Sequence, residues 1–332
     1  MNEKRVAING FGRIGRAAFK IALEKKNIEI AAINDLTDNE ILAHLLKYDT
    51  VYGTYDKKVN VDKSNLYVNN KKVPVYNIAD PKKLPWKKMA IDVVLECTGR
   101  FVKDGAAESH IKAGAKRVIV SAPAEGEGNI TTCLLGVNDD AINDTKVISN
   151  ASCTTNSIAP ITAVIDENFK VLKAVLTTIH SYTADQNIVD GPHRDLRRAR
   201  AAGQNIVPTT TGAAIAITKI LPHLEGKFDG IAVRVPTICG SLSDLTYVVE
   251  KSVTVGKVNA VLKRASEKIY LKGILGYTEE PLVSSDILKT SYSAIIDAGM
   301  TRVVDGTLIK ILAWYDNEWG YANRLVEMAG RI

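Results

Sequence analysis

Residues 5–15 read Arg5-Val6-Ala7-Ile8-Asn9-Gly10-Phe11-Gly12-Arg13-Ile14-Gly15, a short apolar run that leads directly into a G-x-G-x-x-G pattern. Between a strand and a helix, the first glycine of this pattern allows a tight turn, and the second lets the backbone approach a pyrophosphate. The third permits close packing of the helix on the strand, and the helix N-terminus binds the anion. The stretch therefore predicts the strand, turn and helix that open a dinucleotide-binding fold.

A second signal is needed, because the glycines alone also fit an ordinary turn in which they occur by chance. Another strand-like run ends at Asn34-Asp35, so Asp35 lies 20 residues after Gly15, where an acid binds a ribose 2′-hydroxyl. An acid at this place repels a 2′-phosphate and so favours NAD over NADP as cofactor. The predicted cofactor-binding residues of this segment are Gly10, Gly12, Arg13, Ile14, Gly15 and Asp35.

The remaining pattern indicates an α/β protein with two domains. Up to residue 150, short Val- and Ile-rich runs alternate with helical patterns, which is typical of a doubly wound parallel sheet. Longer strand-like runs follow and indicate an α+β domain with a mixed, largely antiparallel sheet. We predict a Rossmann-type NAD-binding domain over residues 1–152, completed by a C-terminal helix over 317–332, and a catalytic domain over 153–316. Strands are expected at 5–9, 28–34, 91–97, 117–121, 146–149, 171–180, 230–236, 244–251, 291–297 and 308–315, with helices at 11–25, 104–113 and 258–266 and one ending near 169.

Composition narrows the class of protein. The 332 residues are 46% hydrophobic, which is enough to fill cores, and the net charge of +6 suits anionic small molecules. No apolar run approaches the ~20 residues that span a bilayer, and the first residues lack the pattern of a signal peptide. The four cysteines are widely spaced and match no zinc motif, so neither a metal site nor a disulfide framework is expected. These features favour a cytoplasmic protein.

One cysteine stands out. Cys153 lies in Ser149-Asn150-Ala151-Ser152-Cys153-Thr154-Thr155-Asn156, where short polar residues precede an apolar segment, as at a helix start. There the helix dipole favours the thiolate, and we expect the thiol pKa to fall below its ordinary value. His180 is available as a base. On position alone, a buried structural cysteine is an equally good interpretation.

These segments resemble the phosphorylating glyceraldehyde-3-phosphate dehydrogenases. The cysteine segment and Trp314-Tyr315-Asp316-Asn317-Glu318 are highly specific to that family. Matching segments span nearly the whole chain, at residues 8–16, 149–156, 177–185, 195–201, 205–214, 234–237 and 314–321. The resemblance implies a homotetrameric glycolytic enzyme that uses NAD and inorganic phosphate to convert glyceraldehyde 3-phosphate into 1,3-bisphosphoglycerate.

The resemblance also implies a role for each matching residue. Cys153 would be the nucleophile and His180 the base. Thr183, Asp185 and Arg234 would bind the substrate phosphate, while the inorganic phosphate would lie at Ser152, Thr154, Arg198, Thr211 and Gly212. Ser121 and Asn317 would bind the cofactor, Asn317 through the nicotinamide amide.

Three positions depart from the commoner family pattern. Ile215 stands where many members have lysine, Cys97 stands where serine is usual, and the segment before Asp80-Pro81 lacks an arginine that many members place near the adenine. Two alternatives stay open: an erythrose-4-phosphate dehydrogenase of the same family, and a nucleotide- or RNA-binding role of the dinucleotide site. Nucleic acid is not expected as a partner, because the arginines at 194–200 have no aromatic residues between them.

Overall fold

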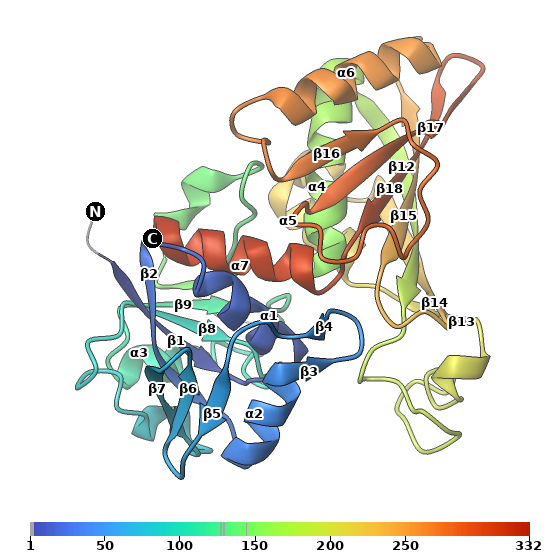
Figure 1. Cartoon of the computed structure of the whole chain (residues 1–332). Helices are drawn as coiled ribbons and strands as arrows, with labels where there is room; N and C mark the ends of the chain where they lie inside the picture. The colour runs from blue at the N-terminus through green and yellow to red at the C-terminus, as the bar shows by residue number, and fades with distance from the viewer. Residues whose placement is uncertain (1–2, 127, 129, 144) are drawn as a thin grey trace. The chain divides into compact units, whose positions relative to one another are not determined.

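The computed structural model describes residues 3–126, 128, 130–143 and 145–332, which form two compact units (Figure 1). The first unit contains Cys133 and the described residues before it, together with Asp139–Ala151 and Ala322–Ile332. The second contains Leu134–Asn138 and Ser152–Tyr321. Each unit is built around one large sheet, and the predicted α/β fold class is confirmed.

The sheet of the first unit has the strand order β10-β11-β9-β8-β1-β2-β7-β6-β5. It is parallel from β10 to β7, and the apolar residues of its central strands are buried, as is typical of a parallel sheet whose two faces are covered. Its strands are β1 (Lys4–Asn9), β2 (Ile28–Asn34), β5 (Val59–Val61), β6 (Asn65–Val68), β7 (Lys71–Tyr76), β8 (Val93–Glu96), β9 (Arg117–Val120), β10 (Thr131–Thr132) and β11 (Val147–Ser149). The pair β3 (Tyr48–Asp49) and β4 (Gly53–Thr54) is separate.

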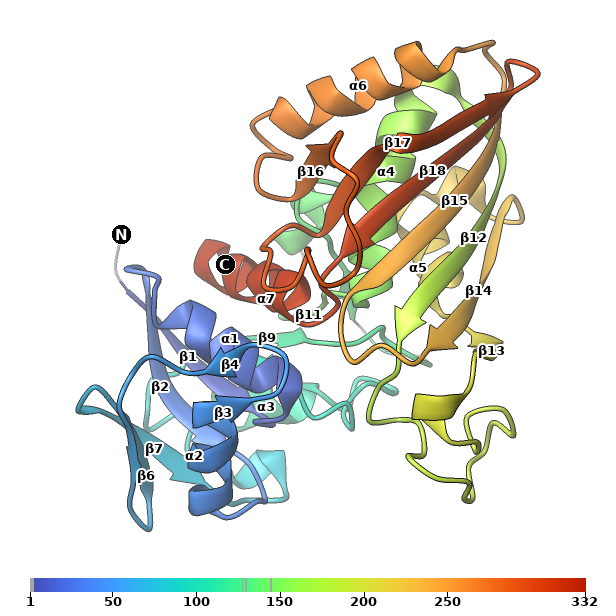
Figure 2. The same ribbon diagram turned by 45° about the vertical axis from the view of Figure 1, so that its right-hand side comes forward.

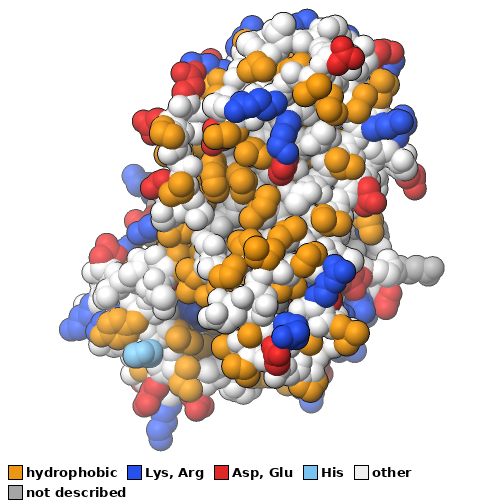
Figure 3. Space-filling view, turned by 90° about the vertical axis from the view of Figure 1, so that its right-hand side faces the viewer, with side chains coloured by type: hydrophobic (Ala, Val, Ile, Leu, Met, Phe, Trp, Pro, Cys, Tyr) orange, Lys and Arg blue, Asp and Glu red, His pale blue; other side chains and the backbone are white. Residues whose placement is uncertain are grey.

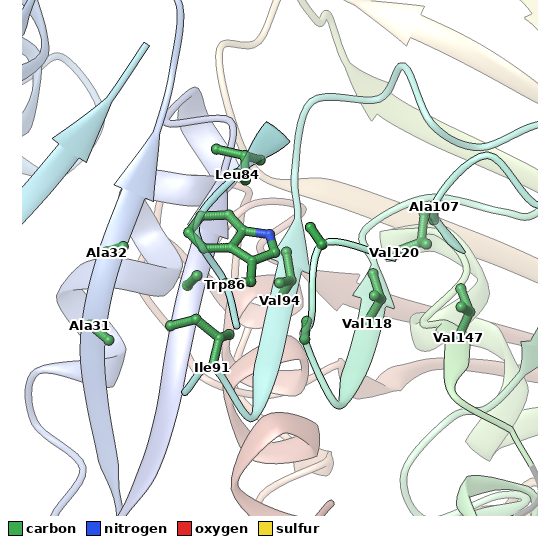
Figure 4. Packing of buried hydrophobic residues seen from close by; sticks show 13 residues of the cluster. Ala31, Ala32, Leu84, Trp86, Ile91, Val94, Ala107, Val118, Val120 and Val147 are labelled. Carbon is green, nitrogen blue, oxygen red and sulfur yellow. The ribbon is translucent and has the colours of Figure 1, made fainter. Parts of the chain in front are cut away.

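The helices of this unit include α1 (Arg13–Ala22), α2 (Asn39–Lys47), α3 (Glu108–Lys112) and, from Ala322 onward, α7 (Trp319–Arg331). The core includes Trp86, which packs among the aliphatic residues Leu84, Ile91 and Val94 (Figure 4). Because β1 ends at Asn9 and α1 begins at Arg13, the glycine-rich turn occupies the place that the sequence predicts.

The structure differs from the sequence prediction at several places in this unit; α2 and the β3–β4 pair, for example, were not predicted. At one edge, β7, β6 and β5 form an antiparallel extension that was not predicted; β6 and β7 are joined by Asn69 and Asn70, both with left-handed backbone. The helix predicted over 104–113 is shorter and begins only at Glu108. Asp104 and Gly105 both have a positive φ, which interrupts a right-handed helix.

The second unit has a mixed sheet with the order β13-β14-β12-β15-β18-β17-β16. Only the pairs β12–β14 and β16–β17 are parallel. Helices pack together against this sheet (Figure 2). The elements are α4 (Cys153–Phe169), β12 (Val171–Ser181), β13 (Val207–Thr210), α5 (Ala213–Ile220), β14 (Phe228–Val235), β15 (Ser241–Val249), α6 (Val255–Glu267), β16 (Leu275–Thr278), β17 (Ala294–Val304), β18 (Leu308–Tyr315) and the start of α7 (Trp319–Arg331).

Hydrophobic side chains remain exposed on the second unit. Val175 on β12 and Ile231 on β14 are 57% and 51% exposed. The long irregular segment between β12 and β13 adds Ile188, Val189 and Leu196. Figure 3 shows hydrophobic side chains gathered on the side of the molecule that faces right in Figure 1. Apolar surface of this extent is typical of a protein–protein interface.

Gly15→Ala is expected to destabilise the protein, because a Cβ at Gly15 would lie 2.1 Å from the carbonyl oxygen of Gly10. Such overpacking costs about 1–3 kcal/mol, so the melting temperature should fall measurably in scanning calorimetry. Gly12→Ala is the matched control, because a Cβ there meets no atom within 4 Å. Equal melting temperatures for the two variants would show that this close approach of α1 to the turn is not required.

Candidate functional site

The thiol of Cys153 lies at the first residue of α4. Ser152 caps this helix, since its Oγ accepts a hydrogen bond of 3.1 Å from the backbone N–H of Thr155. Ala151, just before the cap, is fully buried and has a φ of +50°, a conformation that costs energy for any residue with a Cβ. Left-handed backbone therefore immediately precedes the N-cap of α4. The predicted helix start at this thiol is confirmed.

His180 lies at the end of β12 and faces this thiol. Its Nε2 is 3.5 Å from Sγ of Cys153, and its Nδ1 is 2.7 Å from the carbonyl oxygen of Ser181. Nδ1 also lies 2.8 Å from Nη1 of Arg234, which can only donate, so its two contacts call for opposite tautomers. In the tautomer with the proton on Nδ1, that N–H donates to the carbonyl oxygen of Ser181. The lone pair of Nε2 is then directed at the thiol. This arrangement suits a general base.

Arg234 lies beside the same histidine because β12 and β14 pair in register, with His180 opposite Arg234. One guanidinium nitrogen, Nη1, lies 2.8 Å from Nδ1 of His180 and donates to the carbonyl oxygen of Ser181 at 2.9 Å. The Nε of Arg234 is buried and has no hydrogen-bond partner. Among the described residues, no carboxylate forms an ion pair with this guanidinium, so it is available to an anionic ligand.

Burial and the charge of Arg234 both shift the pKa values of His180 and of the Cys153 thiol. Burial, followed by this positive charge, lowers the pKa of His180 to about 3, so the imidazole is neutral near pH 7. Burial also raises the pKa of the Cys153 thiol, although Arg234 and a hydrogen bond from Thr154 act in the opposite direction. The sequence-based expectation of a lowered thiol pKa is therefore wrong for this ligand-free chain, because loss of hydration outweighs the helix dipole and the nearby cation.

Arg198 forms a second cationic centre in the same unit. It pairs with the carboxylate of Asp185, its Nε donates to Oγ1 of Thr209 at 3.0 Å, and its Nη2 donates to the carbonyl oxygen of Thr210 at 3.2 Å. The sequence prediction grouped Asp185 with Arg234 instead. In the structure, Asp185 thus pairs with an arginine of the other predicted phosphate group.

The other predicted phosphate residues have local partners. Thr211 accepts from the N–H of Ala213 at 3.2 Å, and Gly212 immediately precedes α5. Oγ1 of Thr154 is 3.0 Å from the hydroxyl of Tyr315, which also contacts Thr178 at 2.8 Å. The carbonyl oxygen of Thr183 accepts from Gln186. Sequence reasoning missed Tyr315, although it belongs to the distinctive segment 314–321.

Asn317 is held in one orientation. Its Oδ1 accepts from the N–H of Gly240 at 3.1 Å and from the hydroxyls of Ser181 and Ser241, both at 3.0 Å. With its oxygen engaged by these donors, the amide group offers its N–H₂ to a ligand. Such a donor would suit the carbonyl oxygen of a carboxamide.

The glycine-rich turn of the first unit borders a separate cavity of about 330 Å³. Its lining includes Gly10, Gly12, Asp35, Ile78 and Thr98. Gly10 has a φ of +92°, and a Cβ there would lie 2.8 Å from the backbone of Thr98. Asp35 accepts from the N–H of Phe11 at 2.6 Å and so lies at the turn. The shape, the acid and the following N-terminus of α1 fit a dinucleotide.

Three further residues bear on this pocket. The guanidinium of Arg13 pairs with Asp49 at 2.7 Å, whereas Arg100 lines the pocket. Arg100 is a positive charge on the wall of this pocket. The arginine that many family members place near the adenine is absent from the segment before Asp80. Ser121 follows β9, and its N–H donates to the carbonyl oxygen of Glu96 at 2.9 Å.

The described residues provide neither a metal-binding cluster nor a membrane span. Among them, no group of three or more His, Cys, Asp or Glu side chains could hold a metal ion. In the same part of the chain, no helix is both long and apolar enough to cross a membrane.

Comparisons with known proteins agree with this arrangement. Residues 4–104 match the family model described as "Glyceraldehyde 3-phosphate dehydrogenase, NAD binding domain", and residues 152–317 match its C-terminal domain. The chain is 52% identical to glyceraldehyde-3-phosphate dehydrogenase of Geobacillus stearothermophilus over 330 residues, covering 99% of this chain and 98% of that protein. It is 54% identical to the enzyme of the same name from Thermotoga maritima, with 97% of each chain covered. The chain therefore belongs to the glyceraldehyde-3-phosphate dehydrogenase family.

Proposed function

We propose that this protein is an NAD-dependent, phosphorylating glyceraldehyde-3-phosphate dehydrogenase. It oxidises glyceraldehyde 3-phosphate and joins inorganic phosphate to the product, which gives 1,3-bisphosphoglycerate in glycolysis. The observation that carries this proposal is the pair of Cys153 and His180, with Nε2 of the neutral histidine 3.5 Å from the thiol. Membership of the family and its NAD-binding domain supports the proposal independently.

Cys153 is proposed as the nucleophile. The thiol sulfur forms a bond to the aldehyde carbon, while the thiol proton passes to Nε2 of His180 and from there to the former carbonyl oxygen, which leaves the imidazole neutral again. The resulting hemithioacetal has a tetrahedral carbon that can release hydride. NAD, when bound, supplies the acceptor for that hydride. As the carbonyl re-forms, a basic imidazole removes the hydroxyl proton, an effect typically worth about 10²–10⁴-fold in rate.

The thioester on Cys153 retains the energy of the oxidation. Inorganic phosphate attacks its carbonyl carbon, the carbon–sulfur bond breaks, and the acyl phosphate leaves the enzyme. Because burial raises the thiol pKa, the sulfur is activated chiefly by transfer of its proton to His180 during attack. The neutral state of that histidine makes this transfer possible.

The two arginines are proposed to bind different phosphates. Arg234, with Thr183 and Asp185, would bind the C3 phosphate of the aldehyde. Its buried, unpartnered Nε supports the binding of an anion there. Arg198, with Thr211 and neighbouring residues, would bind the inorganic phosphate. Arginine suits both places because its planar group pairs two oxygens at once.

We also propose a cytoplasmic homotetramer. The exposed apolar residues of β12, β14 and the irregular segment support self-association, since such a surface is rarely left open to water. Asn317 is proposed to donate its amide to the nicotinamide carboxamide, and Ser121 to contact the cofactor. Arg13 and Ile14 would contribute through the first turn of α1.

Iodoacetamide is expected to label Cys153 first among the four cysteines. Burial raises the pKa of both Cys97 and Cys133 to about 12, and Cys239 is also buried. Because the pKa of Cys153 is itself raised, its labelling rate without NAD should climb through a midpoint above the ordinary value of about 8.5. Peptide mass spectrometry across pH 5–10 measures this, and a plateau reached below pH 7 would contradict the burial argument.

Cys153→Ser tests the nucleophile itself. The variant should bind NAD as the parent does and lose nearly all turnover, because a hydroxyl stays protonated where a thiol can ionise. Calorimetric titration with NAD is the folding control. Retention of a substantial fraction of the rate would show that another residue attacks the aldehyde.

Arg234→Leu and Arg198→Leu should fail in different ways. The first should mainly weaken use of the phosphorylated aldehyde and leave oxidation of unphosphorylated glyceraldehyde nearly unchanged. The second should mainly raise the KM for inorganic phosphate and leave the initial burst of NADH intact. Because Asp185, predicted to act with Arg234, pairs with Arg198, a binding control with NAD is needed for both variants. The same loss for substrate, phosphate and burst would show that the two sites are not separate.

Asp35 is expected to make NAD the preferred cofactor. A 2′-phosphate would approach its carboxylate at the turn, and like charges so placed cost several kcal/mol. A preference of at least ~100-fold in kcat/KM follows, since about 1.4 kcal/mol corresponds to tenfold. Rates with the two cofactors, compared side by side, measure it. Equal efficiency would remove Asp35 from this role.

A further inference from the structure

Three polar residues meet at the carboxyl edge of the parallel sheet, beneath the dinucleotide pocket. Asn9, Asn34 and Glu96 are the last residues of β1, β2 and β8. The strands are neighbours, and Asn9 is in register with both Asn34 and Glu96. All three side chains are at most 5% exposed. Asn9 and Asn34 line the pocket, whereas Glu96 is not among its lining residues.

Glu96 accepts hydrogen bonds on both carboxylate oxygens. Its Oε2 accepts from Nδ2 of Asn9 at 2.5 Å and from Nε2 of His110 at 2.9 Å. Its Oε1 accepts from the N–H of Thr98 at 2.8 Å and from the hydroxyl of Thr98 at 2.5 Å. That hydroxyl also accepts from the N–H of Arg100, so its own hydrogen is free to point at Glu96. Four donors therefore surround an ionised carboxylate.

The histidine in this network does not neutralise the carboxylate. The indole N–H of Trp86 donates to Nδ1 of His110 at 3.0 Å. An indole can only donate, so Nδ1 has no proton and His110 is the neutral tautomer with its proton on Nε2. His110 and Trp86 are both 0% exposed. Trp86 belongs to the hydrophobic core of this unit, so its packing fixes the direction of the chain of hydrogen bonds (Figure 4).

The chain of hydrogen bonds continues from Asn9 to the opposite wall of the pocket. Nδ2 of Asn34 donates to Oδ1 of Asn9 at 2.7 Å and to the carbonyl oxygen of Ile78 at 3.0 Å. Oδ1 of Asn34 accepts from the N–H of Ile78 at 3.0 Å. The amide of Asn34 thus holds Ile78, a lining residue, through both of its backbone groups.

Each hydrogen bond from Glu96 through Asn9 and Asn34 to Ile78 requires its amide in one orientation. A flip of the Asn9 amide would turn N–H₂ toward the donor of Asn34. A flip of Asn34 would break both of its bonds to Ile78. The orientation of the pocket wall therefore depends on the acceptor oxygen of Glu96, which accepts the hydrogen bond from the amide of Asn9.

We propose that Glu96, oriented by His110 and Trp86, is a positioning residue for the adenosine half of NAD. The carboxylate touches no ligand itself. It fixes Thr98 on one side of the pocket and, through Asn9 and Asn34, Ile78 on the other. A purely apolar core would fill the same space without fixing these directions. A buried carboxylate is costly unless all of its hydrogen bonds are made, so it favours the one geometry that makes them. This inference rests on the proposed placement of NAD in this pocket.

Glu96→Gln is the direct test, because a glutamine keeps the size but replaces one acceptor oxygen with a donor. Whichever way its amide turns, an N–H₂ faces either Thr98 or the pair Asn9 and His110. The Kd for ADP-ribose and for NAD, measured by calorimetric titration of the full chain, should rise about tenfold or more. The kcat at saturating NAD, and the KM values for aldehyde and phosphate, should stay within twofold.

Two other variants separate positioning from general stability. Tyr247→Phe removes one buried hydroxyl, which contacts Thr162 at 2.9 Å in the second unit. It should lower the melting temperature without changing the Kd for ADP-ribose. Trp86→Phe removes the donor to His110 together with part of the buried ring, at a residue that does not line the pocket. It should raise the Kd for ADP-ribose at least about threefold, and it decides the question if Glu96→Gln does not fold.

Asp35→Asn distinguishes failure of this inference from failure of the pocket assignment. It should weaken ADP-ribose because Asp35 borders the pocket. If Asp35→Asn weakens the ligand while Glu96→Gln and Trp86→Phe leave its Kd within twofold, the positioning role of Glu96 is overturned. If Asp35→Asn has no effect either, the adenosine half of NAD does not lie in this pocket, and the inference falls with that assignment.

Discussion

The chemistry of the second unit depends on the placement of one positive charge, Arg234, against a buried imidazole. Burial is the larger cause of the lowered pKa of His180, and Arg234, which the parallel register of β12 and β14 sets beside it, lowers the pKa further, so the histidine remains neutral. A protonated imidazole at this place would face the cation without water between them, and its cost in free energy would be large. Burial and the sheet register together therefore keep this histidine unprotonated, as a base must be.

The same charge acts on the thiol with less effect. Both the cation and the start of α4 favour a thiolate, yet burial of the sulfur has the greater influence. A thiol that stays protonated until a base takes its proton is protected from reaction with adventitious electrophiles. In this arrangement reactivity arises from the pair, since neither residue alone has a pKa that favours reaction near neutral pH.

The sequence predicted the parts of the fold whose signals are local. The run ending at Asn9, the glycine turn and the long final strand each have a periodicity or a turn residue that reports their structure directly. The edge hairpin of β6 and β7 was missed because Lys71 and Lys72 weaken its apolar pattern, although Asn69-Asn70 marks its turn. The helix predicted over 104–113 is shorter in the structure, because left-handed backbone at Asp104 and Gly105 prevents it from beginning there.

The features of the candidate site also divide into those that the sequence predicted and those that depend on the folded chain. Cys153 and His180 were identified from the sequence because their residue types and neighbours are distinctive. The ion pair between Arg198 and Asp185 was not predicted, because it depends on the path of an irregular segment. The thiol pKa was predicted with the wrong direction since burial is a property of the folded chain. Glu96 and His110 also gave no signal in the sequence, because a buried carboxylate beside a neutral histidine is recognisable only from its donors.

Buried polar groups thus serve opposite purposes in the two units. In the second unit, Arg234 keeps a donor without a partner, which costs free energy unless an anion binds, so the incomplete set of bonds favours a ligand. In the first unit, every oxygen of Glu96 is satisfied, and the complete set of bonds favours one geometry. An unsatisfied buried donor prepares a site for binding, whereas a fully satisfied acceptor holds the surrounding wall in place. Both follow from the high cost of removing polar groups from water without replacing their hydrogen bonds.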